Sequence, residues 1–363
     1  MAIVGAGPAG TAAAAHLGRL GVKDVVLLDK HTFPRDKTCA SGVSPNGVKV
    51  LRELGVWDEV RPHAYSIQGA RIVTPGGHEA WVRAGPEIEA IVCLRRTLDH
   101  AILRRAESAG VRFVPHFTAA RLLTEGGRVA GCVAKDGREV RARVTVIAGG
   151  THCDLVPRRP RRKIIQAIMG WWEGVPFREH HVEMLFDRSL LPLYGWLFPE
   201  GDGRVNIGIA YEDPKGEKNA RELFRSFLDR HFADRLQRAT LVGDFKGHPI
   251  TYSYRIAKLY SPGRLVIGES GRLTHPATAE GIYQGMRSGM FAAECLRDVM
   301  VSGVDERAAF ASYERRCRAE FRSSFVAGGV IRALLRTPVF DLMVKASGRP
   351  LVRRAAAQLL AAL

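Results

Sequence analysis

Three glycines near the beginning of the chain have the spacing of a loop that binds a dinucleotide. Gly5, Gly7 and Gly10 form the pattern G-x-G-x-x-G between an apolar run at residues 2–4 and an alanine-rich segment at residues 8–20. In such a loop the first glycine makes the turn, the second lets the backbone approach a diphosphate, and the third lets helix and strand pack closely. The helix N-terminus adds free N–H groups and a partial positive charge. The residues predicted to contact the dinucleotide here are Gly5, Gly7, Pro8, Ala9 and Gly10.

An acidic residue follows the next apolar run at a distance typical of ribose recognition. Residues 25–28 are apolar, Asp29 comes nineteen residues after Gly10, and Lys30 follows directly. A carboxylate at this strand end is placed to accept hydrogen bonds from the adenosine ribose. The order strand, glycine loop, helix and second strand predicts a parallel βαβ unit, with Asp29 and Lys30 in the binding site. The loop by itself does not distinguish FAD from NAD.

Three further segments resemble motifs of one enzyme family. The segments are DKTCASGVSPNG at 36–47, YGWLFP at 194–199 with VNIG at 205–208, and GESG at 268–271 with PATAEGI at 276–282. They are similar to D-K-x-C-G-x-G-[LV]-[TS]-P, to Y-x-W-x-F-P with a trailing V-x-x-G, and to G-D-A-x-G followed by P-x-x-G-E-G-I. These are motifs of the geranylgeranyl reductase family of FAD-dependent oxidoreductases.

The resemblance implies both a fold and a cofactor. The fold would be like that of para-hydroxybenzoate hydroxylase, in which FAD lies extended under a β-sheet substrate domain. The family reduces isolated double bonds in the prenyl chains of lipids, chlorophyll precursors and quinones, and relatives with this fold hydroxylate or halogenate. Glu269 stands where the family has Asp. By the same resemblance, the residues that contact FAD would include Lys37, Cys39, Ala40, Arg95, Gly268, Glu269, Gly271, Gly281 and Ile282.

Cys39 and His275 are the candidate catalytic residues. Reduction of a carbon–carbon double bond by a flavin needs a hydride on one carbon and a proton on the other, in a pocket that excludes water and oxygen. Cys39 matches the family motif and has Arg35 and Lys37 nearby in the sequence, which favour a reactive thiol. His275, in the expected flavin loop, is a second candidate for donating a proton or a hydrogen bond. The alternatives are a packing role for the cysteine and a structural role for the histidine.

Tyr194, Trp196 and Phe198 alternate along the chain, so a strand there presents all three on one face. Composition alone favours ordinary core packing, but the family resemblance favours substrate binding. An aromatic face suits a flat apolar substrate beside a flavin ring. We therefore expect these three residues to bind a small apolar, prenyl-like substrate. Trp171 and Trp172 either extend this pocket or, the preferred alternative, pack in the core.

One departure from the family pattern concerns the electron donor. Residues 148–150 read AGG, whereas many relatives have G-A-D-G, so an acidic residue is missing near the expected path of a nicotinamide. Direct reduction by NAD(P)H and reduction by another donor, such as an external reductase, both remain open. Ala40, Ser41 and Ala279 also depart from the family pattern, which fits a changed substrate.

These motifs need an α/β fold (α+β overall) with three parts. A helix is expected at 97–110 and another at 281–300. The expected parts are a Rossmann-like FAD-binding domain with a parallel sheet (1–64, 94–164 and 256–300), an antiparallel-sheet substrate domain (65–93 and 165–255) and a helical C-terminal tail (301–363). The basic run RRPRRK at 158–163 is expected to be an exposed connector.

The chain is strongly basic. Its 363 residues include 54 Lys and Arg against 37 Asp and Glu, a formal net charge of +17. This excess favours an anionic partner, but no recognition helix or basic–aromatic motif supports nucleic-acid binding. Residues 301–363 hold 11 Lys or Arg against 5 Asp or Glu, with apolar residues among them. This tail either contacts an anionic membrane surface peripherally or docks on the protein itself.

The six cysteines are scattered, with no C-x-x-C pair and no histidine at metal-ligand spacing, so no metal site is predicted. Six cysteines in a chain of this length do not indicate a disulfide framework, and a reducing cytosol is the expected compartment. The first twenty residues lack the basic leader of a secretion signal, and no apolar run is long enough to span a membrane. We expect a cytoplasmic location, with membrane association as an alternative.

The sequence leaves three functions open. The preferred one is an FAD-dependent reductase that saturates a double bond of a prenyl or similarly apolar substrate. The second is an FAD-dependent monooxygenase, halogenase or dehydrogenating tailoring enzyme that acts on a small metabolite. Halogenation is disfavoured because residues 195–199 read GWLFP and lack the second tryptophan of G-W-x-W-x-I-P. The third is a flavin-binding protein without catalytic turnover.

Overall fold

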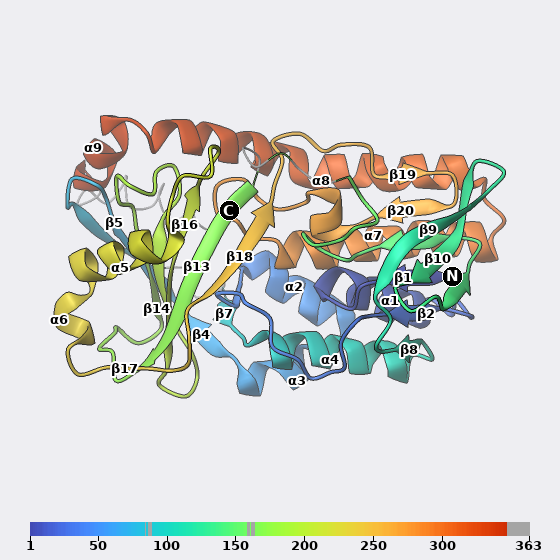
Figure 1. Ribbon diagram of the computed structural model, residues 1–363, viewed down its shortest axis with the longest axis horizontal. Coiled ribbons are helices and arrows are strands. Elements are labelled where there is room, and N and C mark those ends of the chain that lie inside the picture. Colours follow the sequence, from blue (N-terminus) through green and yellow to red (C-terminus); the bar gives the residue numbers. More distant parts are fainter. Residues whose placement is uncertain (84, 86–88, 158–159, 161–163, 347–363) are drawn as a thin grey trace.

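The computed structural model describes residues 1–83, 85, 89–157, 160 and 164–346. A parallel sheet and its helices form one half of the molecule, and a large, mainly antiparallel sheet forms the other (Figure 1). The α/β fold class expected from the sequence is confirmed. Most of the basic run and the last part of the C-terminal tail lie outside the described residues.

The first half contains a six-stranded sheet in the order β19-β20-β12-β1-β2-β8, parallel except for β19. The strands are β1 (Ala2–Val4), β2 (Val26–Leu28), β8 (Arg112–Val114), β12 (Thr145–Ile147), β19 (Tyr260–Ser261) and β20 (Arg264–Val266). Every residue of β1, β2 and β12 is buried. Such continuous apolar strands are typical of a parallel sheet that is covered on both faces.

Helices cover one face of this sheet and a small antiparallel sheet covers the other. Ile3, Leu27 and Val146 belong to the core on the helical face. Val4 and Leu28 pack on the opposite side, in the core that contains Cys132. The covering elements are α1 (Pro8–Arg19), α4 (Arg95–Ser108) and α7 (Ile282–Val301) on one face, and β9 (Ala119–Glu125), β10 (Arg128–Ala134) and β11 (Glu139–Arg141) on the other.

Small residues let α1 and α7 lie close together. A Cβ on Gly289 of α7 would lie only 2.4 Å from the carbonyl oxygen of Ala9 on α1. The alanine-rich composition of α1 therefore serves close helix packing, which holds the N-terminus of α1 in place beside the parallel sheet.

The second half is built on an eight-stranded sheet in the order β17-β13-β16-β15-β14-β5-β6, with β18 also paired to β13. Its pairs are antiparallel except for β14 with β5. The strands are β5 (Gly69–Val73), β6 (Glu79–Arg83), β13 (Ile164–Glu173), β14 (His181–Leu185), β15 (Gly195–Pro199), β16 (Val205–Glu212), β17 (Thr240–Leu241) and β18 (Lys246–Thr251).

The two faces of the large sheet bury different partners. On β16, Ile207 and Ile209 pack on Phe224 and Phe227 of the outer helix α5 (Ala220–His231), which α6 (Ala233–Leu236) follows. Ala210 alternates with them and belongs to the core on the inner face. This alternation is typical of a strand between two layers. The inner face of the sheet lines the cavity described below.

A small three-stranded sheet and short helices connect the two halves. They are β3 (Gly42–Val43), β4 (Tyr65–Ile67), β7 (Ala90–Val92), α2 (Pro45–Leu54), α3 (Trp57–Val60) and η1 (Arg61–His63). Within the expected excursion at 65–93, β5 and β6 join the large sheet, whereas β4 and β7 pair in the small one. The domain boundaries drawn from the sequence stay a prediction.

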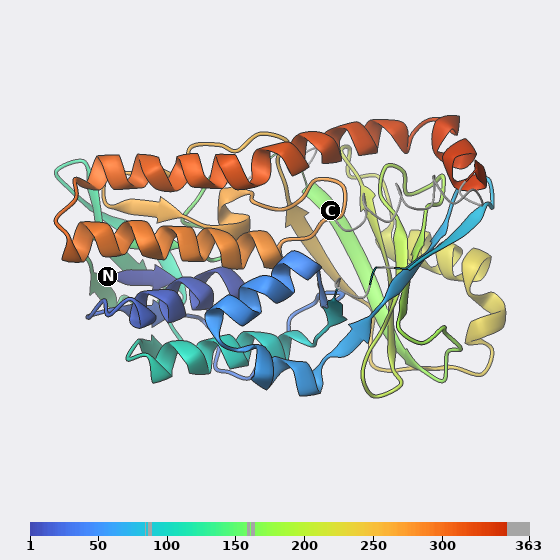
Figure 2. The ribbon, with the colours of Figure 1, turned by 180° about the vertical axis from the view of Figure 1, so that it is seen from behind.

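The described part of the C-terminal tail docks on the protein. Helix α8 (Glu306–Leu334) runs along both halves of the molecule beside α7 (Figure 2). Its residues in the core are Phe310, Tyr313, Cys317, Phe321 and Phe325. These residues are three or four positions apart, so they form one stripe of the helix. Helix α9 (Pro338–Ala346) then reaches β6. Within residues 1–346, as far as they are described, no helix has the length and apolar character needed to cross a bilayer.

Candidate active site

The glycine loop lies between β1 and α1, and its shape depends on missing side chains. Gly5 has a φ of +106°, and a Cβ there would lie 2.5 Å from the carbonyl oxygen of Ala148. A Cβ on Gly10 would lie 1.8 Å from the carbonyl oxygen of Gly5. Gly7 has no described atom within 4 Å of its Cβ position. The loop thus forms a tight turn whose middle glycine leaves room for a ligand, as expected from the G-x-G-x-x-G spacing.

Asp29 is held rigidly at the end of β2. Its Oδ2 accepts a hydrogen bond from the Ala6 amide at 2.6 Å, and its Oδ1 accepts one from the His31 amide at 2.9 Å. Each carboxylate oxygen has a second lone pair, so the group can still accept hydrogen bonds from a ribose. The side chain therefore connects the glycine loop to the strand end and remains able to bind a ligand.

One cavity of about 1100 Å³ extends from the glycine loop to the inner face of the large sheet. The predicted site residues that line it are Gly5, Gly7, Pro8, Ala9, Asp29, Lys30, Lys37, Cys39, Ala40, Arg95, Glu269, Gly281, Ile282, Tyr194, Trp196 and Phe198. Those that do not line it are Gly10, Gly268, Gly271 and His275. The first three are glycines in tight contacts. Gly268, for example, has a φ of +57°, and its Cβ would lie 2.7 Å from the Ala9 side chain.

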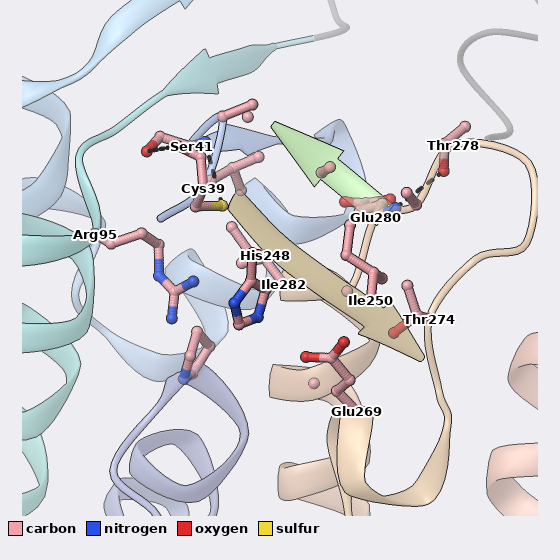
Figure 3. A pocket seen from close by; sticks show the side chains of 18 of the residues that line it. Cys39, Ser41, Arg95, His248, Ile250, Glu269, Thr274, Thr278, Glu280 and Ile282 are labelled. Atoms are coloured by element: carbon pink, nitrogen blue, oxygen red, sulfur yellow. Dashed lines mark hydrogen bonds between the residues drawn. The ribbon is translucent and has the colours of Figure 1, made fainter. Parts of the chain in front are cut away.

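Basic side chains gather on the cavity wall near Cys39, as Figure 3 shows for Arg95 and His248. Lys37 Nζ lies 3.2 Å from His248 Nε2 on β18. Burial, followed by the charge of Arg95, lowers the pKa of Lys37. Burial, followed by the charge of Lys37, lowers the pKa of His248 to about 3. His248 is therefore neutral at neutral pH, and its Nε2 accepts the hydrogen bond that Lys37 donates.

Two arginines share one buried carboxylate. Arg95 is the first residue of α4, although the sequence placed it ahead of a helix beginning at 97, and it forms an ion pair with Asp99. Arg35 Nη2 lies 3.1 Å from the same carboxylate. Arg35 Nε and Nη1 are buried and have no hydrogen-bond acceptor among the described residues. Buried donors without an acceptor are rare, and these lie in a residue that lines the cavity, which fits an anionic ligand such as the diphosphate of FAD.

Glu269 lies in the turn η3 (Gly268–Gly271), where its carboxylate is fixed by threonines. Its Oε1 accepts hydrogen bonds from the Thr251 amide at 3.0 Å and from the Thr151 hydroxyl. Its Oε2 lies 3.8 Å from the Cβ position of Gly150, whose φ is +72°. An acidic side chain at 150 would face this carboxylate. The longer residue at 269 and the missing acidic residue at 150 are therefore neighbours in space.

The aromatic residues form a continuous wall of the cavity. The ring of Trp196 lies 6.4 Å, between centroids, from both Tyr194 and Phe198. Trp196 Nε1 donates to Asn206 Oδ1 at 2.7 Å, and the Tyr194 hydroxyl donates to the Thr278 carbonyl at 2.7 Å. Because both polar groups are satisfied, the wall offers an apolar surface to the cavity.

Trp171 and Trp172 lie outside this wall. Trp172 belongs to the core under the outer helices, and Trp171 donates a hydrogen bond from Nε1 to Glu200 at 3.1 Å. Neither residue is in the cavity lining. The core-packing alternative of the sequence analysis therefore describes their positions.

Cys39 and Glu280 both line the cavity (Figure 3). The Ser41 amide donates a hydrogen bond to Cys39 Sγ at 3.3 Å. The Ser44 amide donates to Glu280 Oε1 at 3.4 Å. Burial raises the pKa of Glu280 to about 7. A carboxyl group with this pKa holds a proton in part of the molecules at neutral pH and can act as an acid.

His275 is fully buried and lies away from the cavity lining. Its Nδ1 accepts a hydrogen bond from the Thr278 amide at 3.2 Å, and its Nε2 lies 3.1 Å from the carbonyl oxygen of Ser324 on α8. Burial lowers the pKa of His275, so the neutral ring donates from Nε2. With both nitrogens engaged, His275 holds the loop at 276–282 against α8, and its position does not support the expected proton transfer.

Sequence reasoning did not assign three residues that the cavity contains: Arg35, His248 and Glu280. Glu280 lies within the PATAEGI motif, and its acidic side chain in an otherwise apolar loop was a usable signal. Arg35 precedes the DKTC segment and was noticed only as a neighbour of Cys39. His248 comes from a distant strand of the large sheet, and no local pattern indicates its contact with Lys37.

Comparison with known sequences identifies the family. Residues 1–324 match the family described as FAD binding domain. A menaquinone reductase of Mycobacterium tuberculosis H37Rv is 31% identical over 314 residues, which cover 81% of this chain and 75% of that protein. A digeranylgeranylglycerophospholipid reductase of Methanopyrus kandleri is 28% identical over 361 residues, which cover 94% of this chain and 91% of that protein.

Solved structures show the same fold. A geranylgeranyl bacteriochlorophyll reductase-like protein from Thermoplasma acidophilum matches with a TM-score of 0.83 at 22% identity, covering 95% of this chain and 90% of that one. A flavin-dependent brominase also matches with a TM-score of 0.83, at 21% identity, covering 99% and 92%. The fold is thus shared by reductases and halogenases. The family match and the sequence relatives together show that this chain belongs to the FAD-binding domain family, as an FAD-dependent oxidoreductase of the geranylgeranyl reductase and menaquinone reductase type.

Proposed function

We propose that this oxidoreductase reduces a carbon–carbon double bond in a prenyl chain or a similarly apolar substrate. The observation that carries the proposal is the continuity of the cavity, which joins the glycine loop to an apolar chamber under the large sheet. Ile72, Val82, Met169, Met184 and Phe186 line this chamber from the strands and their ends. A pocket of this composition binds an apolar chain in preference to a polar metabolite.

The residues present fit FAD at the other end of the cavity. The backbone of the glycine loop and the N-terminus of α1 would bind the diphosphate, and Asp29 the adenosine ribose. Arg35 has buried donors that need an acceptor. Glu269 would accept hydrogen bonds from ribityl hydroxyls. When bound and reduced by an electron donor, the flavin would supply the hydride. The aromatic wall of Tyr194, Trp196 and Phe198 orients the apolar substrate and excludes water.

Saturation of the double bond also needs a proton, and two groups in the cavity are candidates to deliver it. Burial raises the pKa of Glu280 to about 7, so its carboxyl group carries a proton in part of the molecules at neutral pH. Its Oε1 accepts a hydrogen bond from the Ser44 amide. Cys39 is the second candidate and lies on the same cavity. Glu280 is the preferred donor because burial already keeps its acid form populated at the pH at which the enzyme would work.

The test is anaerobic single turnover. The purified protein is loaded with FAD, reduced with dithionite and mixed with a geranylgeranyl lipid in detergent, while flavin absorbance and product mass are followed. The substrate carries no quinone ring, because quinone reduction also adds two hydrogens. The matched control is the same lipid with a fully saturated chain. We expect flavin reoxidation and a product two hydrogens heavier with the unsaturated lipid alone.

Other outcomes identify the alternative functions. A product that gains one oxygen, formed only in air from a small metabolite, would show a monooxygenase. Flavin that stays reduced with every alkene tested, with no oxygenated product formed in air, would show a binding protein without turnover. Repeating the assay with NADPH or NADH in place of dithionite determines whether a nicotinamide reduces the flavin directly or an external reductase is required.

A further inference from the structure

The end of α8 and helix α9 carry an apolar surface that faces solvent. Val326, Val330 and Leu334 are spaced by four residues and follow one side of α8, with 54%, 56% and 39% of each residue exposed. On α9, Leu342 and Met343 are 66% and 47% exposed. Several large apolar side chains exposed close together in the chain usually mark a binding surface. We call these five residues the apolar rim.

The apolar rim is continuous with the interior of the active-site cavity. Leu334 and Met343 are exposed to solvent and also line the cavity. Behind them, Leu335, Phe340 and Val344 line the same cavity from inside. The apolar lining of the cavity therefore continues to solvent-exposed residues at the end of α8 and on α9.

The rim is presented by elements that are anchored. The Gly76 amide, in the turn between β5 and β6, donates a hydrogen bond to Asp341 Oδ1 at 2.8 Å. Phe340 packs on Phe186, with ring centroids 4.9 Å apart. Arg332 is 1% exposed, and its Nη1 donates to the Pro276 carbonyl at 2.7 Å. Figure 2 shows α9 at the outer edge of the molecule, where the β5–β6 ribbon reaches it.

Positive charges flank the rim. Arg322 lies four residues before Val326 on α8 and is exposed, and Lys345 is exposed near the end of α9. Arg336, which follows α8, is exposed but forms an ion pair with Glu212 at 3.1 Å. An apolar strip between cations is the pattern that places a helix at the surface of an anionic bilayer. We propose that the apolar rim docks on an anionic lipid bilayer and lets an apolar substrate pass from the bilayer directly into the cavity. This inference rests on the proposed function, because an apolar lipid substrate is what makes a bilayer the partner.

Vesicle binding tests the surface without turnover. The full-length FAD-loaded protein is sedimented with vesicles of phosphatidylcholine containing 30% phosphatidylglycerol, and with vesicles of phosphatidylcholine alone. The test variant is Val326→Ser/Val330→Ser/Leu342→Ser, because these residues are exposed and do not line the cavity. The control is Val301→Ser/Val304→Ser, at valines that are 60% and 41% exposed at the end of α7 and just after it. We expect the test variant to lose about tenfold or more in partitioning, because it lacks three apolar side chains that the bilayer would bury. We expect the control to bind unchanged.

The outcomes separate this inference from the proposed function. Absence of binding to anionic vesicles, or equal binding by both variants, would overturn the docking surface. The docking surface would also be overturned if the parent protein formed a dimer and did not bind vesicles, and if the test substitutions dissociated that dimer. The rim would then contact a second copy of the chain. Turnover of detergent-solubilised lipid without vesicle binding leaves the proposed function intact. Vesicle binding without alkene reduction would refute the proposed function but would still support the docking surface.

Discussion

Arg95 and Asp99 form a bidentate ion pair one turn apart on α4. Arg95 Nε donates to Asp99 Oδ1 and Arg95 Nη2 to Asp99 Oδ2, each at 2.8 Å, and the side chains are 6% and 0% exposed. Burial opposes the charge of Arg95, but the Asp99 carboxylate outweighs it and raises the arginine pKa. Since Asp99 also holds Arg35, one carboxylate positions both guanidinium groups on the cavity wall. Asp99 is thus a positioning residue.

Replacing Asp99 with Asn should leave two buried guanidinium groups without a counter-charge. We expect a loss of roughly 3–5 kcal/mol in the free energy of unfolding of the FAD-free protein, the usual cost of breaking a buried ion pair. Bound FAD should reduce the loss, because its diphosphate supplies negative charge. Urea unfolding with and without FAD measures both values. Asp136→Asn is the control, because its ion pair with Arg138 is exposed and its removal should leave stability unchanged. Equal effects of the two substitutions would contradict the prediction.

Local sequence patterns were sufficient to predict much of the fold. The glycine loop and Asp29 could be predicted because a tight turn, a helix start and a strand end are specified by neighbouring residues. The alternation of Tyr194, Trp196 and Phe198 likewise determines their common face. The helix expected at 97–110 lies at Arg95–Ser108. Helix boundaries are set by a few residues at each end, so periodicity locates the helix better than its first turn.

The rest of the site depends on contacts between distant segments. His248 reaches Lys37 only because β18 pairs with β13 and the large sheet lies over the DKTC segment. Glu280 was visible in its motif, but its raised pKa follows from burial, which the sequence does not give. The position of His275 in the loop suggested a catalytic role. In the structure its Nε2 donates a hydrogen bond to the Ser324 carbonyl on α8, which is distant in the sequence. Such pairings have no local signature.

An acidic residue at 150 should be costly in this chain. Gly150→Asp would place a carboxylate beside Glu269, whose Oε2 lies 3.8 Å from the Cβ position. Repulsion raises the pKa of the introduced carboxyl group in the folded protein above its unfolded value, so the cost is present at high pH and disappears as the pH falls below that unfolded value. We expect about 1–4 kcal/mol at pH 8.

Gly150→Asn is the matched control for that substitution. Asn has the size of Asp and tolerates the left-handed φ of +72° equally well, so only the charge differs. Unfolding of both variants is measured between pH 8 and pH 4. A difference that is not reduced at pH 4, or no difference at pH 8, would show that the charge of Glu269 does not explain the missing acid. Adding Glu269→Gln to Gly150→Asp should restore stability to that of the Asn variant.

Glu280 should set the pH dependence of the proton transfer. Its pKa is raised to about 7 by burial, so the acid form is complete below this pH and is lost as the pH rises through it. The anaerobic rate of flavin reoxidation by an alkene should therefore be constant at low pH and fall tenfold per pH unit above about 7. In Glu280→Gln the rate should drop by about 10²–10⁴, the usual contribution of a general acid, and lose this dependence.

The two proton donors can be separated because their substitutions leave different groups behind. In Glu280→Gln the amide oxygen can still accept the hydrogen bond from Ser44, so FAD affinity and the flavin spectrum should match the parent protein. In Cys39→Ser the hydroxyl can still accept from the Ser41 amide. If Glu280 delivers the proton, Cys39→Ser keeps the fall in rate above pH 7. A flat profile in Cys39→Ser together with an unchanged one in Glu280→Gln would instead make the thiol the donor, since the group that titrates must be the group whose removal abolishes the titration.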